Sequence, residues 1–315
     1  MRVVLLVLVF ALSEFIVVNS ARCEIKINVP EVFIQSMKNI KKQFESEDKD
    51  NSVIVFDDDC TVSAKDNVKK ISETAIDIIP MKYIDEHMSN KSASEYAFFI
   101  TFATDRMVLA YTQKSKYSTE INRENWPSYL RKSEVKFGLV SDFTKICNVR
   151  QLLALKLSQR SYLQPNLYAT LYNKSLKYSN VREIVEASHR GDVDYLITYR
   201  TIAIENGLNY IELPDMASLS NDCYKAIYNN TYVEIPQEDG SLKRLSGDCI
   251  YFSIAVKKGY ENDPEVTEFL NYFLGDDAKE LLESHGFYVG FYPEFRGDLK
   301  KLSFRLRGLV NYAGF

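Results

Sequence analysis

The sequence predicts an α/β protein of two lobes joined by two hinge segments, and three observations support this prediction. Short runs rich in β-branched and aromatic residues alternate with amphipathic helical runs along the chain. The 315 residues exceed one ordinary domain and suit two lobes. The apolar run 98–112 is interrupted by Asp105 and Arg106, which favours two strands joined by a segment that crosses between the lobes.

Residues 1–20 predict a cleaved export signal. A positive start precedes an apolar run, and Val18 and Ser20 occupy the positions that signal peptidase recognises, so we expect cleavage before Ala21. The alternative is an uncleaved membrane anchor, but Glu14 interrupts the apolar run and keeps it below the roughly 20 residues that span a bilayer. We therefore expect an exported chain, located in the periplasm, on the cell surface or outside the cell.

The segments after the signal supply the first part of lobe 1. Their short β-branched runs predict strands at 24–29, 53–56 and 75–79. A helix is expected at 32–44, because its apolar residues recur at helical spacing on one face. A second helix is expected at 65–72.

The middle and last thirds of the chain repeat this pattern. The expected strands span 136–140, 195–199, 209–213 and 250–256, and the expected helices span 148–162, 180–190 and 277–284. Asp263 predicts the start of a further helix, since Pro264 occupies its first position.

This order of elements predicts how the chain divides. We expect lobe 1 to contain residues 21–106 and 205–315, and lobe 2 to contain residues 107–204. The two hinge crossings are then expected near 105–111 and 203–213, around a cleft that opens and closes.

Composition and motifs exclude several functions. The net charge is −4 with acidic and basic residues interspersed, so the sequence does not predict nucleic-acid binding. The three histidines are far apart in the sequence, and no hydrolase, zinc-protease or phosphate-loop motif occurs, so we expect no metal, no cofactor and no catalytic residue. An enzyme with Cys147 as its nucleophile is the least favoured of the functions that stay open.

Five cysteines are informative in an exported chain. Cys223 and Cys249 bracket a turn-rich excursion, and we expect a disulfide between them. Glycosylation sequons begin at Asn90, Asn173 and Asn229, and they matter only in a eukaryotic secretory pathway.

Four segments resemble the extracellular tungstate/molybdate-binding proteins of ABC importers. They are Phe102–Leu130, Val135–Gly138, Asp194–Asp215 and Asn262–Leu274, and the match is collinear over the mature chain. The resemblance implies a type II periplasmic-binding-protein fold, also called a Venus flytrap. It also implies a small oxyanion in the cleft and a partner ABC permease, and we expect the chain to be a monomer.

The positions that bind the anion in that family differ in this sequence. Val32 stands nearest the family's first serine, and Ser63 is the hydroxyl nearest the second. Lys145 replaces an aspartate before the middle helix, and Thr198 replaces a glutamate before Tyr199. Losing both carboxylates leaves a site richer in hydrogen-bond donors, as a tetrahedral dianion requires.

The candidate ligand contacts are therefore side chains and the start of one helix. They are Ser63, Lys145, Thr198 and the backbone N–H groups of Cys147, Asn148 and Val149. Asp57, Asp58 and Asp59 either face solvent or converge on the cleft, where they would repel a dianion and favour a cation.

The sequence thus predicts an exported solute-binding protein that captures a small oxyanion for ABC-type transport. The alternative is an interaction or sensing domain that keeps the flytrap scaffold and has lost oxyanion binding, since several expected ligand positions are changed.

Overall fold

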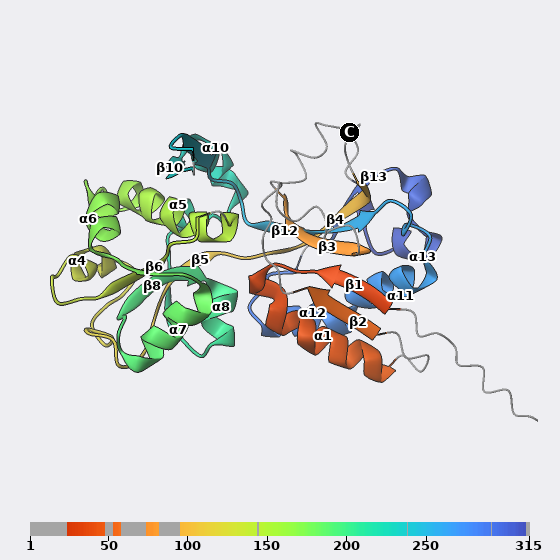
Figure 1. Cartoon of the computed structure of the whole chain (residues 1–315), viewed down its shortest axis with the longest axis horizontal. Coiled ribbons are helices and arrows are strands. Elements are labelled where there is room, and N and C mark those ends of the chain that lie inside the picture. The colour runs from red at the N-terminus through yellow and green to blue at the C-terminus, as the bar shows by residue number, and fades with distance from the viewer. Residues whose placement is uncertain are drawn as a thin grey trace, which may run out of the picture.

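Two α/β lobes lie side by side in the computed structural model (Figure 1). The structure describes residues 24–47, 53–57, 74–81, 95–143, 145–237, 239–290 and 292–312. Within these residues, lobe 1 contains a seven-stranded sheet and lobe 2 a five-stranded sheet. This mixed α/β architecture confirms the predicted fold class.

The sheet of lobe 1 is built from both ends of the chain. Its strand order is β14-β13-β4-β12-β3-β1-β2. The strands are β1 (Glu24–Asn28), β2 (Val53–Asp57), β3 (Ile76–Pro80), β4 (Tyr96–Thr104), β12 (Tyr251–Lys257), β13 (Glu294–Gly297) and β14 (Asn311–Tyr312). The order places β12 between β3 and β4 and antiparallel to both, so a late segment completes the sheet.

The helices of lobe 1 follow the predicted apolar faces. They are η1 (Glu31–Phe33), α1 (Ile34–Glu47), α11 (Pro264–Phe273), α12 (Asp276–Ser284), η3 (Leu299–Lys301) and α13 (Phe304–Arg307). The Asp263 carboxylate accepts hydrogen bonds from the backbone N–H groups of Glu265 and Val266, each at 3.0 Å, which confirms the predicted start of α11. Phe33 stacks on Phe287 at 4.1 Å between ring centroids, which joins η1 to the segment after α12.

The sheet of lobe 2 has the order β7-β6-β8-β5-β9. Its strands are β5 (Met107–Tyr111), β6 (Phe137–Val140), β7 (Leu176–Tyr178), β8 (Tyr195–Tyr199) and β9 (Asn209–Glu212). The helices are α4 (Trp126–Leu130), α5 (Ile146–Ser161), α6 (Leu167–Lys174), α7 (Val181–Arg190), α8 (Arg200–Glu205) and α9 (Asp215–Ser218). Most of α5 is buried, so this helix forms the centre of the lobe.

The first crossing between the lobes lies at the predicted place. Strand β4 ends at Thr104 in lobe 1, and β5 begins at Met107 in lobe 2, with Asp105 and Arg106 between them. The interruption of the apolar run therefore marks a change of sheet.

The second crossing lies later than the sequence predicts. Strand β9 pairs antiparallel with β5, from Val108 opposite Glu212 to Tyr111 opposite Asn209, so residues after 205 still belong to lobe 2. The chain then forms η2 (Asp222–Tyr224), α10 (Lys225–Asn230) and the hairpin β10 (Tyr232–Pro236) and β11 (Leu242–Ser246), and returns to lobe 1 beside Ile250. The Asp105 N–H donates to the Ile250 carbonyl at 3.3 Å, so the two crossings are adjacent. The expected boundary at residue 205 is therefore corrected to about Ile250. The sequence misplaced it because β9 belongs to lobe 2 only through its pairing with β5, which is distant in the chain.

Cys223 and Cys249 do not form the predicted disulfide. Both are free thiols, and Cys249 is buried whereas Cys223 is exposed. Several predictions fall outside the described residues: the export signal, the helix at 65–72, Ser63, and the orientation of Asp58 and Asp59. Asp57 ends β2. No helix in the described part of the chain combines the length and apolarity that a membrane crossing needs.

Candidate functional site

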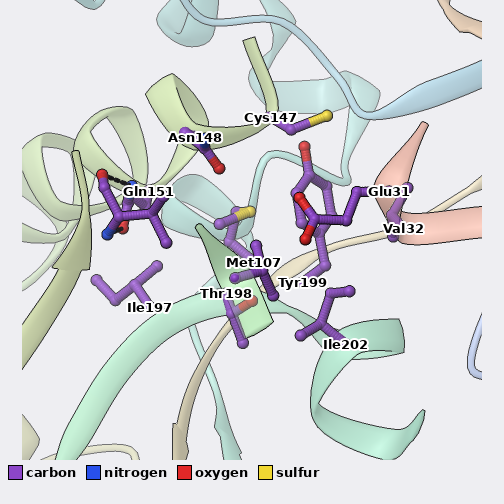
Figure 2. Close-up of a pocket in the computed structure, with 12 residues that line it drawn as sticks. Glu31, Val32, Met107, Cys147, Asn148, Gln151, Ile197, Thr198, Tyr199 and Ile202 are labelled. Atoms are coloured by element: carbon purple, nitrogen blue, oxygen red, sulfur yellow. Dashed lines mark hydrogen bonds between the residues drawn. The ribbon is translucent and has the colours of Figure 1, made fainter. Parts of the chain in front are cut away.

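A pocket with about 390 Å³ of empty space, its open mouth included, lies between the two lobes. Lobe 1 contributes Glu31 and Val32 at the start of η1. Lobe 2 contributes the ends of β6 and β8 and the starts of β5, α5, α7 and α8, with Met107, Cys147, Gln151, Thr198 and Tyr199 among the lining residues (Figure 2). The pocket thus occupies the cleft that the two-lobed prediction requires.

The position of the pocket follows from the topology of both sheets. Glu31 follows the end of β1, Val140 ends β6, and Thr198 and Tyr199 end β8. In α/β sheets, ligands bind outside the carboxyl ends of the strands, where the following helices begin. Loops from both lobes therefore present side chains and helix N-termini to one space.

The first turn of α5 faces this pocket. Lys145 is its N-cap residue, and the N–H groups of Asn148 and Val149 donate to the Lys145 carbonyl at 3.0 and 3.2 Å. These two predicted donors are therefore used inside the helix. The N–H groups of Ile146 and Cys147 have no backbone acceptor among the described residues, as is usual for the first turn of a helix.

The start of α5 is fixed on the end of β6. The Gln151 side chain accepts from the Val140 N–H at 3.1 Å and donates to the Val140 carbonyl at 2.6 Å. The Asn148 side chain donates to the Asp142 carbonyl at 2.8 Å. Asn148 thus lines the pocket with its polar group engaged, while Val149 is fully buried beneath it. These bonds hold the helix N-terminus in a fixed orientation, as an anion site requires.

Thr198 and Tyr199 form the floor of the pocket at the end of β8. Thr198 is 6% exposed, and its hydroxyl has no hydrogen-bond partner within the described segments. The Arg150 guanidinium donates to the Tyr199 hydroxyl at 3.0 Å from α5. Arg150 is buried, so a cation lies directly behind the pocket wall. Thr198 was predicted as a ligand contact, and the structure places it in the pocket.

The Cys147 thiol lies beside the Tyr199 hydroxyl and forms a hydrogen bond with it. Burial raises the pKa of the Cys147 thiol above its ordinary value, although the Arg150 guanidinium acts in the opposite direction. The thiol is therefore protonated near neutral pH. A nucleophilic cysteine requires the opposite shift, toward the thiolate.

Lys145 lies near the pocket rather than on its lining. Its ammonium group is 3.8 Å from the Asp142 carboxylate, and its side chain is 23% exposed. Lys145 still acts on the pocket electrostatically, because it lowers the pKa of Glu31. Glu31 is the charged residue of the lining that the sequence did not lead us to expect, and its place shortly after the first strand was the signal that could have identified it.

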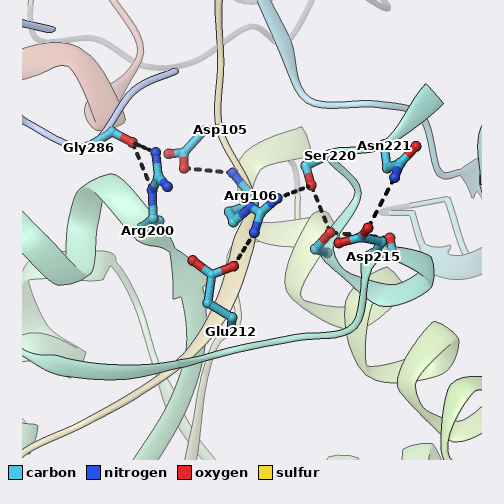
Figure 3. A network of polar contacts seen from close by, with 9 residues as sticks. Asp105, Arg106, Arg200, Glu212, Asp215, Ser220, Asn221 and Gly286 are labelled. Carbon is cyan, nitrogen blue, oxygen red and sulfur yellow. Dashed lines mark hydrogen bonds and ion pairs between the residues drawn. The ribbon is translucent and has the colours of Figure 1, made fainter. Parts of the chain in front are cut away.

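A polar network surrounds the first crossing between the lobes (Figure 3). The Asp105 carboxylate accepts hydrogen bonds from the Arg106 N–H at 2.6 Å and from the Thr201 hydroxyl. Burial raises the pKa of Asp105 to about 7, against the influence of Arg200 and Arg150. Arg106 also pairs with Glu212, which ties the crossing to β9.

Two further contacts connect the lobes beside this network. Arg200 of α8 donates to the Gly286 carbonyl, with 3.0 Å between Nε and oxygen (Figure 3). The His285 ring bonds Glu205 of α8 at 2.8 Å and Asn39 of α1 at 2.9 Å. In the described part of the chain, no group of three His, Cys, Asp or Glu side chains is placed to hold a metal ion.

Comparison with known proteins agrees with this architecture. The chain is 24% identical over 254 residues to an uncharacterized solute-binding protein of Petrotoga mobilis, which covers 78% of each chain. It is 29% identical over 214 residues to the molybdate/tungstate-binding protein WtpA of Thermococcus kodakarensis, which covers 60% of this chain and 59% of that one.

Two solved structures share the fold. The periplasmic molybdate-binding protein of Azotobacter vinelandii superposes with a TM-score of 0.55 and 10% identity, over 85% of this chain and all of that one. The sulfate-binding protein SubI of Mycobacterium tuberculosis gives a TM-score of 0.58 and 13% identity, over 92% and 93%. The predicted periplasmic-binding-protein fold is thereby confirmed. Residues 25–288 match the sequence profile described as bacterial extracellular solute-binding protein, and the chain belongs to that family.

Proposed function

We propose that this chain captures a small tetrahedral oxyanion in the pocket between its lobes and delivers it to an ABC importer. The observation that carries this proposal is the start of α5, a 16-residue helix whose first turn lines the pocket through Cys147 and Asn148. A helix N-terminus carries partial positive charge and unpaired donors, and both favour an anion.

The other groups at the pocket support the same ligand class. The Thr198 hydroxyl adds a neutral donor, and the buried Arg150 guanidinium adds positive charge behind Tyr199. Lys145 adds a further cation near the mouth. Donors that are already fixed in the backbone or by burial lose little conformational entropy when a ligand binds. Such donors suit a compact dianion, whose oxygens accept several hydrogen bonds at once.

The names of two relatives suggest which oxyanions to test first. Two relatives, from Thermococcus kodakarensis and Pyrococcus abyssi, are described as binding molybdate or tungstate. We therefore propose molybdate or tungstate as the first ligands to test, with sulfate and phosphate as the next. Ser63, which follows β2, remains a proposed contact on the lobe 1 side.

Two consequences of the proposed function concern partners and location. Delivery to a transporter requires an ABC permease that recognises the closed form, and we propose that the chain acts as a monomer. We propose that the segment 1–20 is a cleaved signal, in keeping with the extracellular family. We propose no reaction, because the Cys147 thiol is held protonated.

Thermal unfolding of the mature protein with molybdate, tungstate, sulfate and phosphate tests this function at matched ionic strength. A ligand at 100 times its Kd adds about 2.7 kcal/mol to the free energy of unfolding. For a chain of this size we expect a rise in Tm of a few degrees. A rise with molybdate or tungstate supports the proposal, and a rise with sulfate or phosphate alone changes the ligand. No rise with any oxyanion contradicts it.

A further inference from the structure

Glu31 is the one carboxylic acid among the twelve described residues that line the pocket. It enters from lobe 1 at the start of η1 and lines the pocket together with Cys147 and Tyr199 of lobe 2 (Figure 2). A carboxyl group inside an anion site needs an explanation, because a carboxylate and an oxyanion repel each other.

The charged groups around Glu31 come from three elements of lobe 2. Lys145 at the start of α5 and Arg182 in α7 lower the pKa of Glu31, and Asp142 before α5 raises it. Burial has the largest effect and raises that pKa above its ordinary value. Glu31 therefore holds a proton at a higher pH than an exposed glutamate does.

The other titratable groups of the pocket do not exchange a proton in this range. Burial raises the pKa of the Cys147 thiol and, more strongly, that of the Tyr199 hydroxyl, so both are already protonated near neutral pH. Arg150 remains a cation throughout. Among these groups, Glu31 alone can change its protonation when an anion enters.

The contact between Glu31 and a bound oxyanion requires one proton. Two fully deprotonated oxygens offer only lone pairs to each other, whereas a proton between them forms a charge-assisted hydrogen bond. Molybdate, tungstate and sulfate are fully deprotonated near neutral pH, so this proton must come from the solvent. Phosphate at pH 8 carries one proton of its own.

We propose that Glu31 couples the capture of a fully deprotonated oxyanion to the uptake of one proton. The proton adds to a carboxylate oxygen of Glu31, which then donates it to an oxygen of the anion, and no other bond forms or breaks. This inference rests on the proposed function and adds to it a pH-dependent affinity and a preference between two classes of oxyanion.

Isothermal titration calorimetry of the full mature protein with molybdate measures this coupling directly. Titrations at pH 6, 7 and 8, in buffers of different protonation enthalpy, give both the affinity and the number of protons taken up. We expect uptake to approach one proton per anion as pH rises above the pKa of free Glu31. Over the same range the affinity should fall by up to tenfold per pH unit. Phosphate at pH 8 should bind without this uptake.

The Glu31→Gln variant isolates the group responsible. Its amide donates a hydrogen bond without titrating, so molybdate binding should lose both the proton uptake and most of the pH dependence. The matched control is Glu186→Gln, which removes a glutamate whose side chain is 61% exposed on α7 and should leave the uptake unchanged. Thermal unfolding of both variants without ligand confirms that each is folded.

The possible results separate the two proposals. Molybdate binding without proton uptake in the wild-type protein overturns the role of Glu31 alone. Loss of molybdate binding at every pH in folded Glu31→Gln also overturns it, because the carboxylate would then be a direct ligand. If neither protein binds any oxyanion, the proposed function itself fails.

Discussion

Thr198 is the residue whose contribution to ligand binding is most easily isolated. It lies at the end of β8, is 6% exposed, and has a hydroxyl without a partner in the described part of the chain. Thr198→Val keeps the shape and removes the hydroxyl. A hydrogen bond to a charged group contributes about 1.5–3 kcal/mol, so the variant should bind the oxyanion roughly 10- to 100-fold more weakly. Calorimetric titration measures this loss, and an unchanged affinity would remove Thr198 from the site.

Asp105 gives a prediction about stability and pH. Its pKa in the folded protein is about 7, because burial raises it, and an unfolded aspartate has a pKa near 3.9. The folded state therefore binds more protons between these two values, so its contribution to stability is present at low pH and is lost as pH rises through about 7. The slope for one proton is about 1.4 kcal/mol per pH unit.

The Asp105→Asn variant should make this slope shallower between about pH 4 and pH 7. The variant should still show some dependence of stability on pH, because burial also raises the pKa of Glu205, to about 8. Denaturant unfolding at pH 5, 6 and 7 checks the prediction. Equal slopes in variant and wild type would show that Asp105 is not the group that titrates.

Part of the site could be predicted from the sequence. Thr198, Cys147 and Asn148 line the pocket, and Lys145 acts on it electrostatically. The sequence could not show which backbone N–H groups are left to bind a ligand. Asn148 and Val149 use theirs for hydrogen bonds to the Lys145 carbonyl. Glu31 was missed for a different reason, since it meets the other residues only when the two lobes come together.

At the scale of elements, Gly286 is the point where the segment after α12 meets α8. Its φ is +100°, and an added Cβ would lie 2.6 Å from Ile204 Cδ1 and 3.4 Å from Thr201 Cα. The Gly286→Ala variant should lose about 1 kcal/mol of stability from backbone strain. The clash should cost at most about 1 kcal/mol more, because the contacted atom is the terminal methyl of Ile204, which is 36% exposed and can turn aside.

Gly191 is the matched control for this prediction. It ends α7 with a φ of +85°, and nothing lies within 4 Å of its added Cβ. Gly191→Ala should therefore show the strain alone. Denaturant unfolding of both variants gives the difference. A loss at Gly286 larger than at Gly191 by more than about 1 kcal/mol would contradict the prediction that Ile204 moves aside.

The N-cap of α11 provides a second element-scale prediction. Asp263 accepts two backbone hydrogen bonds, and α11 buries Val266, Phe269, Leu270 and Phe273. Asp263→Ala should lower the free energy of unfolding by about 1 kcal/mol. Asp298→Ala, which removes the cap of the three-residue η3, should cost less because less buried structure depends on it. Chemical denaturation compares them, and a larger loss at Asp298 would contradict the reasoning.

Element types could be predicted better than their partners. The strand predicted at 209–213 and the helices predicted at 148–162, at 180–190 and from Asp263 all form, with ends within a few residues of the predicted ones. Sheet membership depends on contacts between distant segments. Strand β9 carries no local sign that it pairs with β5 rather than with lobe 1, which is why the second crossing was placed too early.

At the scale of the whole molecule, the two crossings are adjacent, with the Asp105 N–H bonded to the Ile250 carbonyl. Residues between them form lobe 2, and those outside form lobe 1. Motion of the lobes about these two crossings changes the width of the pocket. Glu31 and Val32 belong to lobe 1, and the other lining residues belong to lobe 2. Closure on a ligand therefore needs few backbone changes, all of them near these crossings.

The position of β12 sets an order of assembly. It separates β3 from β4 in the finished sheet, but a ribosome makes it only after every strand of lobe 2. Until then β3 and β4 each carry an open edge that invites pairing with another chain. We expect ribosome-bound chains that end between β9 and β12 to protect β5 and β8 from hydrogen exchange and to leave β3 and β4 unprotected. Protection of β3 and β4 in such chains would contradict this order. The nascent chain thus exposes unpaired strand edges longest in the lobe whose first strands are made first.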